Sequence, residues 1–158
     1  MSSSAPDHLH GGALQAAISN GVVGTISEFT GRGPTKVRTT FSGDWVFVTL
    51  EDSLTKGERK LAQLGREDSV TRTRHDYQTA MESDLTKMVE ELTGRKVLGY
   101  QSQLIFEPEV VIEIFFFDRA PDHAPVAATA RGLLEDPSIG EARDDAHADD
   151  VSGEIVAD

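Results

Sequence analysis

The chain has no cysteine among its 158 residues. This absence excludes disulfide bonds, thiolate nucleophiles and cysteine-ligated metal centres. Long hydrophobic runs are also missing, because the longest one, Ile114 to Phe117, lies between Glu113 and Asp118. A helix that spans a bilayer needs about 18 or more consecutive apolar residues. We therefore expect that the chain does not insert into a membrane by itself.

Secretory and nucleic-acid-binding features are missing as well. Residues 1–12 are polar and lack the charged start and apolar centre of a signal peptide. The net charge is −12, of which residues 1–120 carry −4 and residues 121–158 carry −8. A nucleic-acid-binding protein would show a basic face. We predict a cytoplasmic protein that reaches a membrane only through a partner and that binds no nucleic acid.

The charge and proline distribution divides the chain into three parts. Apolar residues are concentrated in the middle, whereas prolines and paired aspartates recur after residue 119. Such a composition cannot bury enough apolar surface to fold. The sequence therefore predicts a disordered leader over residues 1–12, one domain over residues 13–119 and an acidic disordered tail over residues 120–158.

Residue patterns within the domain predict three helices and four strands. Leu14, Ile18, Val22 and Ile26 recur every four residues, which is typical of one helix face. Thr55 and Glu58 have the spacing of a capping box, which marks a helix start. The predicted helices cover residues 13–29, 55–64 and 68–93, and the predicted strands cover residues 36–41, 45–50, 97–106 and 110–117.

This element order predicts an α+β fold. Ser42-Gly43-Asp44 and Glu107-Pro108-Glu109 are short turns between β-prone segments, so the four strands form two hairpins. Two hairpins can join into a four-stranded antiparallel sheet, with the amphipathic helices on one face. We expect a two-layer domain of order α-β-β-α-α-β-β, whose other sheet face meets solvent or a second copy.

No residue pattern indicates a catalytic or metal centre. His8, His10, His123 and His147 lie in the predicted disordered ends. His75 and Asp76 are adjacent and point apart on a helix, so they make a poor catalytic dyad. We therefore predict a protein that is not an enzyme and that has no cofactor and no metal.

The segment Gly31-Arg32-Gly33-Pro34 has two interpretations. Backbone N–H groups freed by glycine could cradle an anion together with Arg32. Alternatively, the glycines and the proline only turn a helix into a strand, an interpretation that the segment taken alone favours. Arg38 could add positive charge to an anion site.

The aromatic run Phe115-Phe116-Phe117 predicts an interface. Alternate residues of a strand face opposite sides, so Phe116 points away from its two neighbours. A second copy of the chain would cover Phe116, and we predict a homodimer with Phe116 on the dimer face.

Several short motifs, taken in order, resemble those of the MpsC family over about residues 13–118. The matching segments are Thr30-Gly31-Arg32-Gly33-Pro34, Lys36-Val37-Arg38, Thr49-Leu50-Glu51, Leu54-Thr55 with Glu58, and Leu92-Thr93-Gly94-Arg95-Lys96-Val97. The resemblance implies a soluble accessory subunit of a membrane cation or bicarbonate transport system, with transporter subunits as partners. It supplies no known catalytic or ligand residues. Gly31, Arg32, Gly33, Pro34, Arg38 and Arg95 are candidates for a shared anion or partner contact.

Two functions therefore stay open at this point. One is a non-enzymatic accessory or regulatory subunit that docks on a membrane transport complex. The other is a small-ligand or anion-sensing domain that uses the loop around Arg32.

Overall fold

The computed structural model describes residues 9–121. Residues 122–158 of the predicted acidic tail and residues 1–8 of the predicted leader lie outside this range. The described part has the predicted order of helices and strands, with boundaries that differ by one or two residues. The elements are α1 (Gly11–Thr30), β1 (Lys36–Ser42), β2 (Trp45–Glu51), α2 (Lys56–Gln63), α3 (Glu67–Thr93), β3 (Val97–Ile105) and β4 (Val110–Phe117).

Local capping signals set the helix ends. Gly31 and Gly94 follow α1 and α3 with φ angles of 73° and 65°, a left-handed conformation that glycine adopts without steric cost. The capping box is formed at the start of α2, where the Glu58 amide donates to Thr55 Oγ1 over 3.2 Å. The Thr55 amide in turn donates to Glu58 Oε2 over 2.7 Å.

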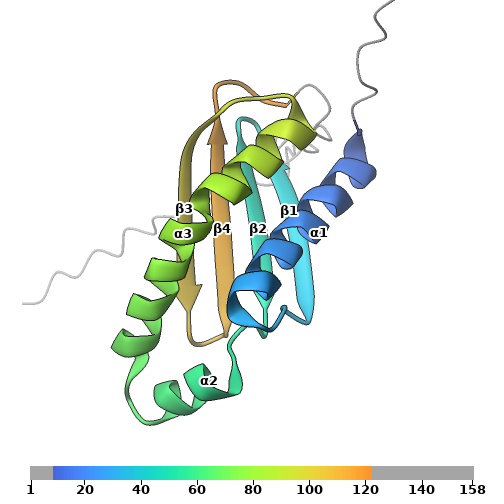
Figure 1. Cartoon of the computed structure of the whole chain (residues 1–158). Helices are drawn as coiled ribbons and strands as arrows, with labels where there is room; N and C mark the ends of the chain where they lie inside the picture. The colour runs from blue at the N-terminus through green and yellow to red at the C-terminus, as the bar shows by residue number, and fades with distance from the viewer. Residues whose placement is uncertain (1–8, 122–158) are drawn as a thin grey trace, which may run out of the picture. The chain divides into compact units, whose positions relative to one another are not determined.

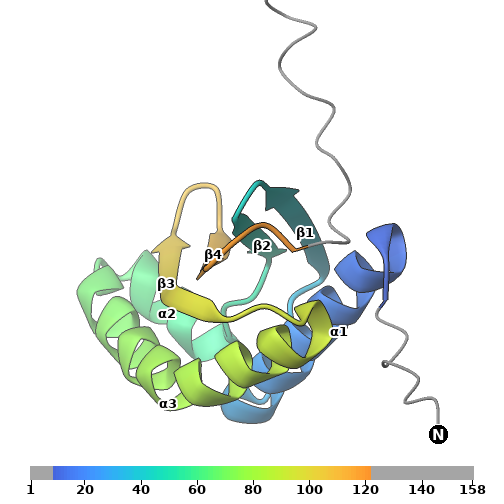
Figure 2. The same ribbon diagram turned by 90° about the horizontal axis from the view of Figure 1, so that it is seen from above.

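The two hairpins join into one antiparallel sheet with the strand order β1-β2-β4-β3. The hairpins meet where β2 pairs with β4, a contact that places Phe47 opposite Ile114. Helices α1 and α3 cover one face of the sheet, and no described helix covers the other (Figures 1 and 2). The predicted two-layer α+β fold is therefore confirmed.

The core lies between the two helices and the sheet. Side chains of Leu14 and Ile18 on α1, and of Leu85 on α3, meet Phe115 and Phe117 on β4, and all five are almost fully buried. The alternate β4 residues, including Phe116, are only half-buried and lie on the outer face of the sheet. None of the helices in the described range combines the length and the apolar run that crossing a bilayer requires.

Candidate functional site

The predicted loop at Gly31–Pro34 lies between the end of α1 and the start of β1. The Gly31 amide donates to Ser27 O over 2.9 Å and closes the helix. A Cβ atom on Gly33 would lie 2.7 Å from Ser27 Oγ, a distance that real side chains do not reach. The positive φ of Gly31 and the contact with Ser27 at Gly33 therefore favour glycine at both positions of the turn.

The guanidinium of Arg32 binds the connection between β2 and α2. It donates to the Asp52 carbonyl over 2.6 Å, to the Leu54 carbonyl over 2.7 Å and to the Asp52 carboxylate over 2.8 Å. The hydrogen bond from Arg32 holds the pKa of Asp52 below its usual value. These contacts support the structural interpretation of the loop, and anion binding by it stays a prediction.

The other candidate residues lie elsewhere on the domain. Arg38 is exposed on β1 and is paired with Thr49 of β2. Arg95 is buried and follows the end of α3, at the opposite end of the sheet from the loop (Figure 1). The structure therefore does not bring Arg32, Arg38 and Arg95 together into one site.

A charge network that the sequence pattern did not reveal surrounds Arg59 of α2. Arg59 Nη2 donates to Asp52 Oδ1 over 2.6 Å and to Glu109 Oε2 over 3.1 Å. Glu109 Oε1 also accepts from the Leu54 amide over 2.8 Å. The network ties the β2–α2 connection to the turn between β3 and β4. Because its partners are 7 and 50 residues from Arg59, no local signal could have found it.

A second pair, Arg74 with Glu58, joins α3 to α2. Arg74 Nε and Nη2 donate to the two carboxylate oxygens over 2.6 Å and 2.7 Å, and Nη2 also donates to the Ser53 carbonyl over 2.8 Å. Burial alone would raise the pKa of Glu58, but hydrogen bonds from Arg74 and Thr55 outweigh it and hold the pKa below its usual value.

A carboxyl group also lies inside the core. Glu113 on β4 is 1% exposed, and the Tyr100 hydroxyl donates to its Oε2 over 2.6 Å. Burial raises the pKa of Glu113, although the hydrogen bond from Tyr100 and the positive charge of Arg74 oppose the rise. Burial and the neighbouring carboxyl also raise the pKa of Tyr100.

These networks join segments of the domain that lie far apart in the sequence. Between residues 9 and 121, no group of three or more His, Asp and Glu side chains is placed to hold a metal ion. The absence of enzymatic activity stays a prediction.

The comparison with protein families assigns the chain. The family model MpsC, described as the Na+-translocating membrane potential-generating system, matches residues 10–119. The chain belongs to the MpsC family. No curated protein and no solved structure is significantly similar to it. The match covers every helix and strand of the described domain. The family assignment therefore applies to this folded domain and its surfaces.

The two middle strands present apolar side chains on the outer face of the sheet. We define this face by Trp45, Phe47, Ile112, Ile114 and Phe116, whose side chains all point away from the helices. Trp45 is 42% exposed and packs on Phe116 with the ring centroids 4.6 Å apart. Phe116 thus lies on the face where the sequence predicted an interface, and its role in a dimer stays a prediction.

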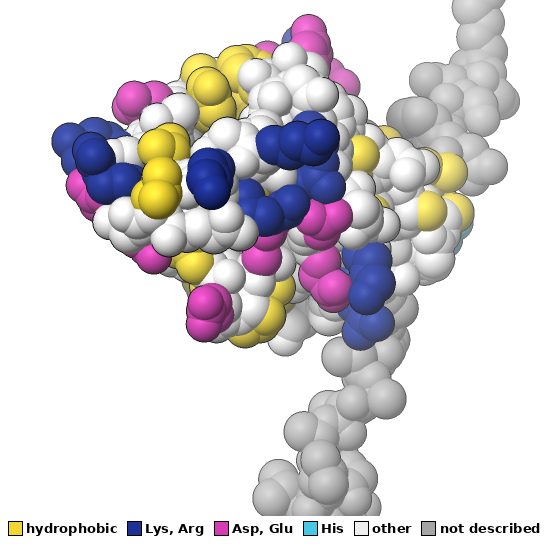
Figure 3. Space-filling model, turned by 90° about the horizontal axis from the view of Figure 1, so that it is seen from below, with side chains coloured by type: hydrophobic (Ala, Val, Ile, Leu, Met, Phe, Trp, Pro, Cys, Tyr) yellow, Lys and Arg dark blue, Asp and Glu magenta, His cyan; other side chains and the backbone are white. Residues whose placement is uncertain are grey.

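The end of the MpsC domain formed by α2 carries exposed charges of both signs. Lys56, Lys60 and Arg66 are exposed there beside the exposed Glu67 and Asp68. Figure 3 views the domain from this end and shows Lys and Arg side chains interspersed with Asp and Glu side chains.

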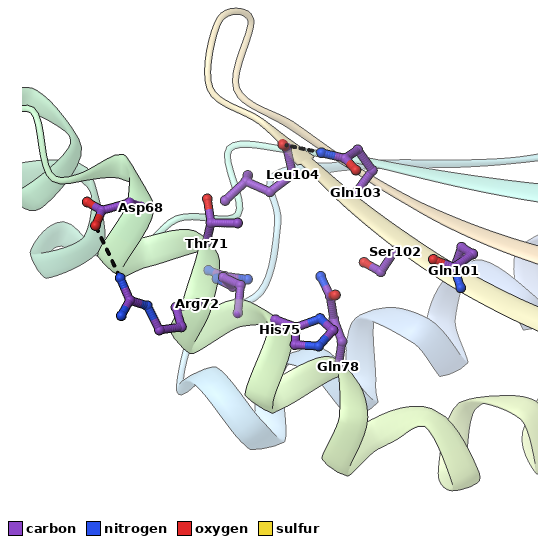
Figure 4. A pocket seen from close by; sticks show the side chains of 10 residues that line it. Asp68, Thr71, Arg72, His75, Gln78, Gln101, Ser102, Gln103 and Leu104 are labelled. Atoms are coloured by element: carbon purple, nitrogen blue, oxygen red, sulfur yellow. Dashed lines mark hydrogen bonds and ion pairs between the residues drawn. The ribbon is translucent and has the colours of Figure 1, made fainter.

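A groove runs between α3 and β3. It has a volume of about 580 Å³ and is lined by polar side chains of both elements, shown in Figure 4. His75, Gln78, Gln101 and Ser102 also line a smaller cavity of about 90 Å³ that extends toward Tyr100. No residue pattern indicated this groove, because it depends on how α3 crosses the sheet.

Proposed function

We propose that this MpsC-family chain is a non-enzymatic accessory subunit that binds a membrane component of a cation-transporting, potential-generating system. The family match links the chain to sodium translocation. None of the helices between residues 9 and 121 is long and apolar enough to cross a bilayer. We assign the ion path to the membrane component. The chain works from the cytoplasmic side and reaches the membrane through its partner.

The observation that carries the proposal is the apolar outer face of the sheet. The Trp45 ring lies between Phe116 and Phe47 in reach of both, with its centroid 4.6 Å from the Phe116 ring and 6.3 Å from the Phe47 ring. Aromatic side chains that can be desolvated together are typical of the residues that dominate binding energy in protein interfaces. A soluble domain with such a face is suited to bind another protein.

Charges around this face define the partner. Lys36 and Arg38 are exposed on β1 along one side of it, and Lys36 also binds Glu51 over 3.2 Å. A complementary partner therefore presents an apolar patch with carboxylates along one border.

Affinity purification of the tagged full chain from gently solubilised native membranes tests the proposal. Trp45→Asp should abolish recovery of a polytopic membrane protein that the unaltered chain recovers. Phe29→Asp is the matched control, because Phe29 is similarly exposed at 38% but lies at the end of α1, away from the outer face.

Circular dichroism should show that both variants fold. Equal recovery with both variants would remove the outer face from the proposal. Recovery of nothing but the chain itself would overturn the accessory-subunit function.

A further inference from the structure

Strand β3 is a sheet edge that, beyond a bulge between Val97 and Gly99, pairs in regular register from Gly99 to Ile105. It is the last strand in the order β1-β2-β4-β3 and extends over nine residues, Val97–Ile105. None of these residues is charged and none is proline. Proteins normally place lysines or prolines on exposed edges to prevent strand pairing. The opposite edge, β1, follows this rule with Lys36 and Arg38. The edge of β3 is therefore suited to pair with another strand.

The position of α3 leaves room for such a strand. α3 crosses the sheet obliquely, so that its first half extends past β3 near α2 and its second half lies over the middle of the sheet (Figure 1). The groove between α3 and Gln101–Leu104 marks the space beside the edge (Figure 4). In a second copy of the chain related by a half-turn, α3 would lie beside α3 of the first copy. It would cover the part of β3 that the first α3 leaves uncovered.

We propose that β3 pairs antiparallel with β3 of a second copy of this chain, with the two-fold axis beside Ser102. The two sheets then become one sheet of eight strands. In this register Gln101 lies opposite the partner's Gln103, and Tyr100 lies opposite the partner's Leu104. Glutamine meets glutamine on one face and an apolar pair forms on the other, so the strand is complementary to itself.

Charges along the groove favour the same arrangement. Arg72 is exposed at the Leu104 end of the groove, and Glu82 is exposed at the Tyr100 end. A half-turn about Ser102 exchanges the two ends, so each Arg72 faces the partner's Glu82. In the single chain Arg72 binds Asp68 over 3.2 Å in an exposed pair. Exposed pairs of this kind are weak and exchange partners easily.

Sedimentation velocity of the full chain over a range of concentrations tests the register. The unaltered chain should form a dimer. Gln101→Lys with Gln103→Lys places like charges opposite each other at both positions and should weaken the dimer about 10-fold. Gln101→Lys with Gln103→Glu places opposite charges there instead and should keep the dimer. Only a register that pairs 101 with the partner's 103 predicts this difference.

A single cysteine gives a second readout, because the chain has none of its own. Paired residues of antiparallel strands have Cα atoms about 4.5–5.5 Å apart, within the range that a disulfide spans. Ser102→Cys should therefore give a covalent dimer under mild oxidation. Ser42→Cys, on the far edge strand β1, is the control and should stay monomeric on a denaturing gel.

The charge pair on α3 is tested by exchange. Arg72→Glu and Glu82→Arg should each weaken the dimer, and the double variant should restore it. A chain that is monomeric at all concentrations would overturn the proposal. So would a dimer that tolerates both lysines but is lost in Trp45→Asp, since it would use the outer face. Loss of the β3 dimer with membrane-partner recovery intact would leave the proposed function standing.

Discussion

Replacing Arg74 should strongly destabilise the domain. The side chains of Arg74 and Glu58 are only 7% and 11% exposed, and two hydrogen bonds of 2.6 Å and 2.7 Å join them. Arg74→Ala removes the hydrogen bonds that the guanidinium donates to the Glu58 carboxylate and to the Ser53 carbonyl. Water reaches this place poorly and cannot fully replace them. Breaking a buried ion pair by removing one partner costs about 3–5 kcal/mol.

We expect the lower end of this range, because Glu58 keeps its hydrogen bond from the Thr55 amide. A loss of about 3 kcal/mol corresponds to a fall in Tm of about 12 °C for a domain of this size. Urea and thermal unfolding followed by circular dichroism measure both quantities. Lys36→Ala is the matched control, since its pair with Glu51 is 74% and 52% exposed. It should cost less than about 0.5 kcal/mol.

The pH dependence gives an independent check. Because the pKa of Glu58 is lowered in the folded domain, its stabilising contribution is present at neutral pH and is lost as the pH falls through that value. Acid should therefore destabilise the unaltered chain more than Arg74→Ala, in which this pKa is no longer depressed by the guanidinium. A cost below about 1 kcal/mol for Arg74→Ala would refute the reasoning, because buried pairs do not break at that cost.

Three further changes have expected outcomes. Glu113→Gln should stabilise the domain relative to the unaltered chain, and the gain should grow as pH rises. Because the pKa of Glu113 is raised in the folded domain, the unaltered chain loses stability when this carboxyl group ionises. Urea titrations at several pH values measure the difference. Gly24→Ala should add about 0.5–1 kcal/mol on α1, whereas Gly21→Ala should gain less, because its Cβ would lie 2.6 Å from Met88 Sδ; thermal unfolding compares them. Arg32→Ala should lower the free energy of unfolding by about 1–2 kcal/mol, because the hydrogen bonds of Arg32 are lost. If the loop binds no anion, phosphate should change the Tm of the unaltered chain and of Arg32→Ala equally.

The element order followed from short-range signals. Gly31, Gly94 and the capping box of Thr55 with Glu58 act within four residues, so the sequence alone could place the helix ends. The turns after Phe41 and Phe106 likewise predicted the two hairpins. Remaining differences are one or two residues at element ends, where hydrogen bonding fades gradually.

The candidate site was harder to predict. The sequence identified Arg32 as notable but not its acceptors, which are 20 and 22 residues away. In the sequence, Glu113 is only the charged residue that precedes the apolar run of β4. Its buried hydrogen-bond partner, Tyr100, lies on the neighbouring strand. Partners of this kind become neighbours only when strands pair, so no spacing in the chain reveals them.

The sequence by itself determined that this protein has no disulfide, contains three helices and two hairpins, and carries MpsC-family motifs in order. These properties depend on residue type and on contacts between near neighbours. Only the tertiary structure decided that β2 and β4 join the hairpins, that α1 and α3 cover one sheet face, and that the uncharged strand β3 becomes an edge. Those outcomes depend on which distant surfaces pack together, and many pairings satisfy the same local preferences until the whole core is formed.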